Sequence, residues 1–419
     1  MSQPHKTAAL KRVVVTGAGA ISPLGNDWPS IHLHLRECRN AVQHMPEWDI
    51  YEGLNTKLAA PAAEFELPSH YNRKTTRSMG RVAIMSVRAT ELALQQAGLL
   101  GDPLLSSGQI GVSYGSSSGT HSAVGDFGRM LNEHTTEGIS ATTYLKMMSH
   151  TAPVNIGVFF GLQGRVITTS SACTSGSQGV GSAYEAIRFG KQVAMIAGGA
   201  EQLDATAAAV FDTLFATSVR NDDPQSTPRP FDANRDGLVL GEGACTLILE
   251  ELEHAQARGA TILAELVGYG TNSDGQHVTQ PSADTMAQAM RLALDDAGLT
   301  PDQIDYVNAH GTATDHGDIA ETTATAQVFG ARMPISSLKS YVGHTLGACG
   351  AYEAWLTIEM MREGWFAPTL NLEARDPRCA DLDYITGEGR ELQAEYVMSN
   401  NFAFGGINTS LIFRRWREE

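Results

Sequence analysis

Hydrophobic and polar positions alternate between two spacings from one end of the chain to the other. Short apolar runs, which are typical of buried strands, occupy residues 12–16, 193–200, 246–251 and 305–309. Apolar residues recur at helical spacing over 80–97, 177–189 and 286–297, and the last segment stops at Gly298. Strands that alternate with helices of this length predict an α/β fold with buried sheets.

A possible internal repeat refines this prediction. The tetrapeptide Ala-Tyr-Glu-Ala occurs at residues 183–186 and again at 351–354, each time in a small-residue helical segment after a Gly- and Ser/Thr-rich turn. Coincidence is the alternative for so short a match. We predict a duplicated α/β unit with a site between the halves, an N-terminal half at residues 10–260 and a C-terminal half at 261–415.

Composition narrows the class of protein. The 46 acidic and 30 basic residues give a formal charge of −16, which argues against nucleic acid or a membrane surface as a partner. No apolar run approaches the roughly 18 residues of a spanning helix. The five cysteines are scattered and form no Cys-x-x-Cys pair, so neither disulfides nor a zinc site are indicated. We therefore expect a globular protein of the reducing cytoplasm.

Two segments imitate ligand-binding motifs. Gly17-Ala18-Gly19 resembles a dinucleotide-binding turn, but Ser22 replaces the third glycine and Pro23 follows, so we predict only a tight turn after the strand. The Asp/Asn pattern at 232–237 resembles the start of a calcium loop, but Gly243 stands where a bidentate glutamate is required. We predict a structural turn there and no bound metal.

Cys173 is the candidate nucleophile. It lies in a Ser- and Thr-rich stretch, residues 168–176, that leads directly into the predicted helix 177–189. A helix N-terminus favours the thiolate, and its free N–H groups can hold an oxyanion. A small buried core cysteine is the alternative, and the residues alone leave the two readings evenly balanced.

Two histidines and a lysine occupy similar turns. His310 follows the strand-like run 304–309, His344 lies in a Gly- and Thr-rich turn, and Lys339 precedes it by five residues. Any single histidine of the thirteen is more often structural than catalytic. Together with Cys173, the set suits acyl transfer followed by stabilisation of a second, anionic intermediate.

Four motifs in this order give the chain a resemblance to the elongating β-ketoacyl-acyl-carrier-protein synthases, types I and II, which are condensing enzymes of the thiolase superfamily. They are Ala-Cys-Thr-Ser-Gly at 172–176, Asn-Ala-His-Gly-Thr at 308–312, Lys-Ser-x-x-Gly-His at 339–344, and the Arg-Asp-Gly…Gly-Glu-Gly pattern at 235–243. The resemblance covers essentially the whole chain. It implies the thiolase fold, with duplicated α/β halves in a layered αβαβα arrangement.

The resemblance also implies a reaction. Cys173 would accept an acyl group as a thioester, and His310 and His344 would bind the malonyl thioester oxygen while carbon dioxide leaves. The resulting carbanion would attack the Cys173 thioester in a Claisen condensation. Lys339 would order the site electrostatically, paired with Glu321, because a buried lysine requires a compensating acid.

The remaining roles follow from the same resemblance. The backbone N–H groups of Cys173 and Phe404 would form the oxyanion hole, and Phe404 would also gate the acyl pocket. Thr312 and Thr314 would hold the phosphopantetheine arm of acyl carrier protein, and no other cofactor is expected. The implied enzyme is an acyltransferase of fatty-acid synthesis that works as a dimer.

Single residues distinguish this chain from enzymes and subunits with related activities. A thiolase would carry a second catalytic cysteine in the C-terminal loop, which here reads Asn-Asn-Phe-Ala-Phe-Gly-Gly at 400–406. An initiating synthase would have asparagine at position 344, and a catalytically dead chain-length factor or a scaffold would lack Cys173. The departures are Ala403 in place of glycine, Asn401 in place of serine, and the serine-rich segment 114–120. They leave open a specialised polyene- or polyketide-like pathway, in which the chain pairs with a chain-length-factor-like partner instead of itself.

A basic segment supplies a candidate docking site. No acidic residue lies between Glu66 and Glu91, while Arg73, Lys74 and Arg77 accumulate there. A solvated surface is the usual explanation for such a run. In so acidic a protein, a local positive patch is what a strongly acidic carrier protein would need.

Overall fold

Successive side chains of the central strand β6 (Ala194–Glu201) are all buried and point alternately into two different cores. The computed structural model describes residues 9–418. In β6, Ala194 and Ile196 pack in one core with α3 (Arg81–Gln96), whereas Met195 and Ala197 pack in a second core with α7 (Ser175–Arg188). Both faces of the sheet are therefore covered by helices.

Eleven strands of the described chain form one sheet, in the order β13-β11-β10-β15-β16-β9-β1-β8-β6-β4-β5. Five of them come from the first half: β1 (Val13–Ile21), β4 (Ile110–Gly115), β5 (Val166–Thr169), β6 and β8 (Gly243–Glu251). Six come from the second half: β9 (Ala264–Ser273), β10 (Tyr306–Asn308), β11 (Pro334–Ser336), β13 (Asp383–Tyr384), β15 (Tyr396–Ala403) and β16 (Ile407–Arg415). Two small sheets lie apart, β2 (Gln43–His44) with β3 (Leu58–Ala60) and β7 (Leu240–Gly241), and β12 (Trp365–Phe366) with β14 (Arg390–Glu391).

The pairing confirms the predicted duplication. Along β1-β8-β6-β4-β5, the successive pairings are antiparallel, antiparallel, parallel and parallel. Along β9-β16-β15-β10-β11, the same sequence of pairings is repeated. The two copies join where β1 runs antiparallel to β9.

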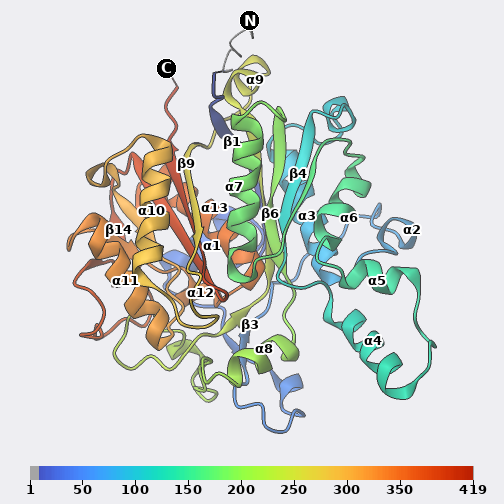
Figure 1. Ribbon diagram of the computed structural model, residues 1–419, viewed down its shortest axis with the longest axis horizontal. Helices are drawn as coiled ribbons and strands as arrows, with labels where there is room; N and C mark the ends of the chain where they lie inside the picture. The colour runs from blue at the N-terminus through green and yellow to red at the C-terminus, as the bar shows by residue number, and fades with distance from the viewer. Residues whose placement is uncertain (1–8, 419) are drawn as a thin grey trace, which may run out of the picture.

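The helices complete the layered αβαβα arrangement. In Figure 1, α7 crosses the centre, α3 and α6 (Thr151–Phe160) lie to one side, and α10 (Ala283–Ala297) and α11 (Asp315–Phe329) lie to the other. The central layer is α7 packed against α13 (Cys349–Glu363). The remaining helices are α1 (Trp28–Arg36), α2 (Arg73–Thr76), α4 (His121–Glu133), α5 (Ala141–Met147), α8 (Ala205–Asp212), α9 (Leu252–Ala257) and α12 (Lys339–Val342).

The predicted helices are confirmed, but the turn at 17–19 is wrong. Strand β1 continues through these residues to Ile21. Gly17 and Gly19 are needed because α3 lies directly on the strand: a Cβ on either residue would overlap a backbone carbonyl oxygen of α3, that of Ala93 or Ala89. The glycines therefore mark a close strand–helix approach instead of a turn.

The Ala-Tyr-Glu-Ala repeat suggested the right architecture through the wrong alignment. Both central helices follow a 3-10 turn whose first residue has a positive φ, Ala172 (50°) before α7 and Leu346 (45°) before α13. Matching these turns places the tetrapeptide in the third turn of α7 but in the first turn of α13. The tetrapeptide match is therefore a coincidence within a genuine duplication.

Two predictions about the chain as a whole have different outcomes. Among residues 9–418, no helix combines the length and the apolarity that crossing a bilayer requires. The division of the chain at residues 260 and 261 stays a prediction.

Candidate active site

Cys173 lies in a tight elbow between β5 and α7. The elbow is the 3-10 turn Ala172–Thr174. Ser175 closes it, because its Oγ donates to the Ala172 carbonyl oxygen at 2.7 Å and accepts from the Ser171 N–H at 3.0 Å. The small polar residues around the cysteine therefore build the turn that presents the thiol.

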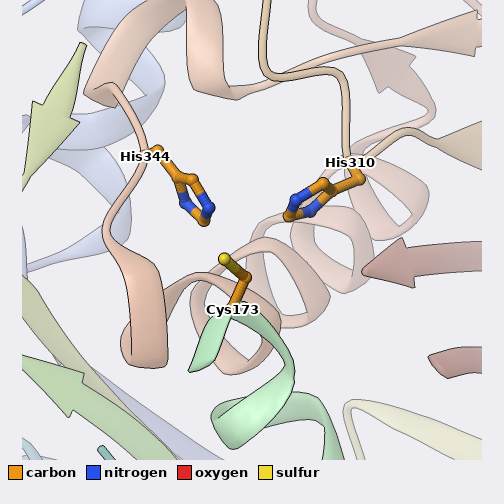
Figure 2. Close-up of side chains that lie close together, drawn as sticks. All are labelled: Cys173, His310 and His344. Carbon is orange, nitrogen blue, oxygen red and sulfur yellow. The ribbon is translucent and has the colours of Figure 1, made fainter. Parts of the chain in front are cut away.

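Three predicted residues converge at the elbow. The Cys173 sulfur and one ring nitrogen each from His310 and His344 lie within 4.8 Å of one another. Figure 2 shows the thiol directed toward the two imidazoles, which come from separate segments of the second half. The two rings are nearly perpendicular, at 87°, with centroids 5.1 Å apart. The site thus forms between the duplicated halves, as the sequence predicted.

Burial, and not the helix, dominates the ionisation of the nucleophile. Only 4% of Cys173 is exposed, and this burial raises the pKa of its thiol to about 11. Lys339 and the backbone N–H groups of Phe404 and Cys173 act in the opposite direction but do not compensate. The backbone N–H groups at the elbow therefore favour the thiolate, as predicted, but burial outweighs them and the resting site holds a neutral thiol.

The partners of the histidines determine where each ring carries its proton. The Leu346 N–H donates to His344 Nδ1 at 3.2 Å, and the Lys339 ammonium lies 3.2 Å from His310 Nδ1. Burial, together with the charge of Lys339, lowers the pKa of both rings well below the usual value, so both are neutral. A neutral ring that accepts at Nδ1 carries its proton at Nε2. Each histidine therefore offers one Nε2–H, and that of His344 has no partner among the described residues.

The counterion of Lys339 differs from the one expected. Lys339 Nζ pairs with Glu353 Oε1 at 2.5 Å, and both side chains are 1% exposed. Burial acts to lower the pKa of Lys339, but the Glu353 carboxylate outweighs it and raises that pKa. Glu321 instead accepts from the backbone N–H groups of His310 and Gly311, each at 2.7 Å. Glu321 therefore shapes the histidine loop, and its pairing with Lys339 was a wrong prediction.

A cavity of about 510 Å³ leads from the surface to the cysteine and both histidines. Thr312, Thr314 and Phe404 line it, and the hydroxyls of the two threonines lie 2.8 Å apart. Phe404 packs on Phe211 with ring centroids 5.3 Å apart. The structure thus brings the predicted arm-binding and gating residues to one channel.

The basic residues predicted for docking lie elsewhere. Arg73 and Lys74 begin the short helix α2 and Arg77 follows it, and all three are exposed. None of them lines the cavity. Two other basic residues of that segment are paired, Arg81 with Glu242 and Arg88 with Glu91.

The cysteine and the two histidines also offer the ligand types of a zinc site. A histidine that binds metal through Nε2 must carry its proton at Nδ1, usually donated to an acceptor. Here both Nδ1 atoms face donors, so the site is not built for a metal. The calcium-like turn is also structural, because Asp232 Oδ2 accepts from two backbone N–H groups of residues 373 and 374.

Sequence reasoning missed three residues that touch this site. Glu353 is the partner of Lys339, Asn401 donates to Glu353 at 2.8 Å, and Cys349 donates to the Cys173 carbonyl oxygen at 3.2 Å. Glu353 could have been found as an acid in a helix of small and apolar residues, where a charge needs a partner. Asn401 was noted only as a departure from the family pattern, with no role attached, and Cys349 gave no comparable signal.

Two family models and a full-length relative match this chain. The model of the beta-ketoacyl synthase N-terminal domain matches residues 10–255, and that of the C-terminal domain matches residues 263–373. The chain is 37% identical over 413 residues to 3-oxoacyl-[acyl-carrier-protein] synthase 2 of Synechocystis sp., covering 97% of this chain and 99% of that protein.

Several solved structures are similar to this chain in both fold and sequence. A beta-ketoacyl synthase from Burkholderia phymatum is 62% identical, with a TM-score of 0.96 over 97% of this chain and 100% of the other. The ishigamide ketosynthase/chain length factor is 31% identical, with a TM-score of 0.87 over 98% of this chain and 100% of the other. The type II ketosynthase AntDE, in complex with the acyl-carrier protein AntF, is 29% identical, with a TM-score of 0.86 over 97% and 100%.

Proposed function

Because the chain belongs to the β-ketoacyl synthase family, we propose that it condenses malonyl-acyl carrier protein with a Cys173-bound acyl group, releasing carbon dioxide and β-ketoacyl-acyl carrier protein. It is an acyltransferase of the 3-oxoacyl-acyl-carrier-protein synthase type. The observation that carries the mechanism is the convergence of one thiol and two neutral Nε2–H donors at the end of one channel.

The first half-reaction transfers an acyl group to Cys173. The sulfur attacks the thioester carbonyl of the acyl carrier, and the N–H groups of Cys173 and Phe404, which both interact with the sulfur, lie where an oxyanion would form. The bond to the carrier sulfur then breaks. The proton of the Cys173 thiol ends on the departing arm thiol, so no net charge remains in the buried site.

The second half-reaction uses the histidines. The Nε2–H groups of His310 and His344 would donate to the thioester oxygen of malonyl carrier, which becomes negative as carbon dioxide leaves. The electrons of the broken carbon–carbon bond form an enolate, whose carbon attacks the Cys173 thioester. The C–S bond breaks, and the departing Cys173 sulfur takes up a proton from solvent and returns to the neutral thiol. Fixed donors in a dry site stabilise such an oxyanion by several kcal/mol, about 10²–10³ in rate for each donor.

Lys339 would act through His310 and not on substrate. Its ammonium is held by Glu353, faces His310 Nδ1 and thereby keeps that ring in the Nε2–H form. The positive charge also lies near the place where the enolate forms. Thr312 and Thr314, in the channel wall, would contact the phosphopantetheine arm, and the reaction as written needs no further cofactor.

Acyl carrier protein would dock on Arg73, Lys74 and Arg77, because their exposed positive charges complement a strongly acidic partner. Changing all three to Glu should raise KM for carrier-bound substrates and leave alkylation of Cys173 unchanged. Unchanged kinetics would remove this patch from the docking surface. The cytoplasmic location stays a prediction.

The chain would work as a dimer, because its sheet ends in an open edge. Among the strands of residues 9–418, β5 pairs with β4 alone, and Val166 on it is 53% exposed. Val158 on α6 is also exposed, as are Tyr144 on α5 and Leu131 on α4. An unprotected edge with apolar neighbours calls for a covering strand. We propose that this covering strand comes from a second copy of the chain. The alternative is a chain-length-factor-like subunit, as in the ishigamide ketosynthase/chain length factor, and it would indicate a specialised pathway.

The test is intact-mass analysis with acyl carrier proteins of several chain lengths. We expect an acyl adduct that is absent in Cys173→Ala and is consumed when malonyl carrier protein is added. If only a co-expressed partner subunit restores the adduct, the specialised pathway is the function. If no acyl length labels Cys173 with or without a partner, the proposed reaction is wrong.

A further inference from the structure

Asn401 lies in β15, fully buried beside the lysine, glutamate and histidine of the site. Its Nδ2 donates to Glu353 Oε2 at 2.8 Å and lies 3.5 Å from His310 Nδ1. The next residue toward the N-terminus, Asn400, points to the other face of the strand, where its Oδ1 accepts from Ser410 at 2.7 Å. The strand therefore provides one asparagine inside the network and a buried, adjacent one outside it.

The chemistry of its partners fixes the orientation of the Asn401 amide. A carboxylate only accepts hydrogen bonds, so the NH₂ group must face Glu353. Glu353 then holds two donors, Lys339 on Oε1 and Asn401 on Oε2. With both oxygens held, the carboxylate cannot rotate, and the Lys339 ammonium stays at 3.2 Å from His310 Nδ1.

This orientation leaves a polar atom without a partner. Asn401 Oδ1 is buried and has no hydrogen-bond partner among the described residues. An unsatisfied buried carbonyl destabilises the folded protein, because it has lost its hydrogen bonds to water. An apolar residue of similar size would avoid that cost, so the amide is explained by its Nδ2 contacts and not by packing.

The same amide reaches toward the nucleophile. Asn401 Nδ2 lies 3.7 Å from Cys349 Sγ, whose thiol donates to the Cys173 carbonyl oxygen at 3.2 Å. That contact is with the main chain of Cys173 and not with its reactive sulfur. The one Asn401 side-chain contact under 3 Å is with Glu353, on the histidine side of the site.

We propose that Asn401 is a positioning residue for the decarboxylation step: by orienting Glu353, it holds Lys339 against His310 and keeps His310 as an Nε2–H donor. The inference rests on the proposed function. It assigns Asn401 to the second half-reaction alone, because neither Glu353 nor His310 is needed to pass an acyl group to Cys173.

The experiment compares both half-reactions in Asn401→Leu, Asn401→Asp and the matched control Asn400→Ser. Acylation of Cys173 is followed by intact mass, and decarboxylation by release of carbon dioxide from malonyl carrier protein. Asn401→Leu should keep acylation within about twofold and slow decarboxylation by at least about tenfold, the usual effect of losing a hydrogen bond to a charged group. Asn401→Asp should slow it further, because two carboxylates then face each other.

The pH profile separates positioning from damage to the fold. Without its amide donor, Glu353 takes up a proton more readily, so the acidic limb of decarboxylation in Asn401→Leu should move to higher pH. Asn400→Ser should show neither the rate loss nor the shift. Equal rates in Asn401→Leu and the unmodified protein, or parallel losses in both half-reactions, would overturn the inference. If Asn401→Leu does not fold, the isosteric Asn401→Asp is compared in the same two half-reactions. Equal rates to the unmodified protein, or parallel losses in both half-reactions, would then overturn the inference. Failure of the unmodified protein in both half-reactions would instead overturn the proposed function.

Discussion

The two halves of the molecule share one packing scheme and divide the chemistry between them. In β1, Gly17 and Gly19 lie against Ala93 and Ala89 of α3, and in β9, Gly268 and Gly270 lie in the same way against Ala293 and Ala289 of α10. A strand with glycines two residues apart thus meets a helix with alanines four residues apart in both halves. The duplication is carried by this contact between backbones and not by a shared stretch of sequence.

The halves differ at their elbows. The second residue of the elbow is Cys173 in the first half and Gly347 in the second. A Cβ added at Gly347 would lie 2.8 Å from the Glu201 carboxylate and 2.9 Å from the backbone nitrogen of Ser117. The N–H of Gly347 itself donates to Glu201 at 3.0 Å. The duplicated fold therefore has space for one nucleophile only, and the second half contributes histidines from its loops.

The largest effect should come from replacing Cys173, and replacement of Cys349, the other buried cysteine of the site, is the matched control. Cys173→Ala should abolish acylation, because Cys173 is the one thiol among the described residues that line the channel. Cys349→Ser should keep it within a few-fold, since Cys349 only donates to a carbonyl oxygen and serine can do the same. Intact mass after incubation with acyl carrier protein measures both. Acylation that persists in Cys173→Ala would contradict the assignment.

The histidine variants should affect the other half-reaction. His310→Ala and His344→Ala each remove one donor from the enolate oxygen, so decarboxylation should fall by about 10²–10³. Acylation of Cys173 should change far less, because its oxyanion donors are backbone groups. Single-turnover measurements of the two steps make the comparison. Equal losses in both steps would show that the histidines also serve acyl transfer.

The shared packing can be tested with matched glycine variants. Gly19→Ala and Gly270→Ala should each destabilise the protein by about 1–3 kcal/mol, because the added methyl overlaps a helix carbonyl. Gly125→Ala in α4 is the control: nothing lies within 4 Å of the added carbon, and helix propensity should stabilise it by about 0.5–1 kcal/mol. Denaturant unfolding measures all three. A tolerated Gly270→Ala would break the equivalence of the halves.

Buried carboxylates in the two halves should respond to pH with opposite signs. In the first half, burial acts to raise the pKa of Glu250, but hydrogen bonds from Arg258 and His254 outweigh it, so that pKa is lowered. Its stabilising effect is present above the unfolded pKa and is lost as pH falls. In the second half, burial raises the pKa of Glu321 to about 8. Folded Glu321 keeps a proton that the unfolded chain has lost, so stability falls as pH rises from about 4.5 to about 8.

Glutamine variants test that contrast. At pH 5, Glu321→Gln should be less stable than the unmodified protein, because its NH₂ group meets one of the two backbone N–H groups that donate to Glu321. From pH 5 to pH 9, that deficit should shrink by about 1–3 kcal/mol, because the unmodified protein then has to ionise the buried Glu321 carboxyl. Glu250→Gln should be less stable than the unmodified protein at both pH values, with no such gain. Thermal unfolding across this pH range provides the measurement. A deficit of Glu321→Gln that does not change between pH 5 and pH 9 would show that burial does not control the pKa of Glu321.

Much of the site could be predicted from the sequence, because its catalytic residues lie in local motifs. Cys173, His310, His344 and Lys339 each stand in a short Gly-, Ser- or Thr-rich turn, and the structure brings them to one site. Glu353 and Asn401 could not be assigned in this way. Their roles depend on side chains that meet from separate segments, Lys339 and Glu353 across 14 residues and Asn401 and Glu353 across 48, and a one-dimensional pattern does not show which side chains meet.

The sequence by itself determined the alternation of strands and helices and the Gly-, Ser- and Thr-rich turns that carry the candidate site residues, because hydrophobic period and turn composition are local properties. Only the tertiary structure decided that β1 runs through Gly17 and Gly19, that Lys339 pairs with Glu353 instead of Glu321, and that burial keeps the Cys173 thiol protonated. Close packing and desolvation set these three outcomes, and both arise only when distant segments exclude water together.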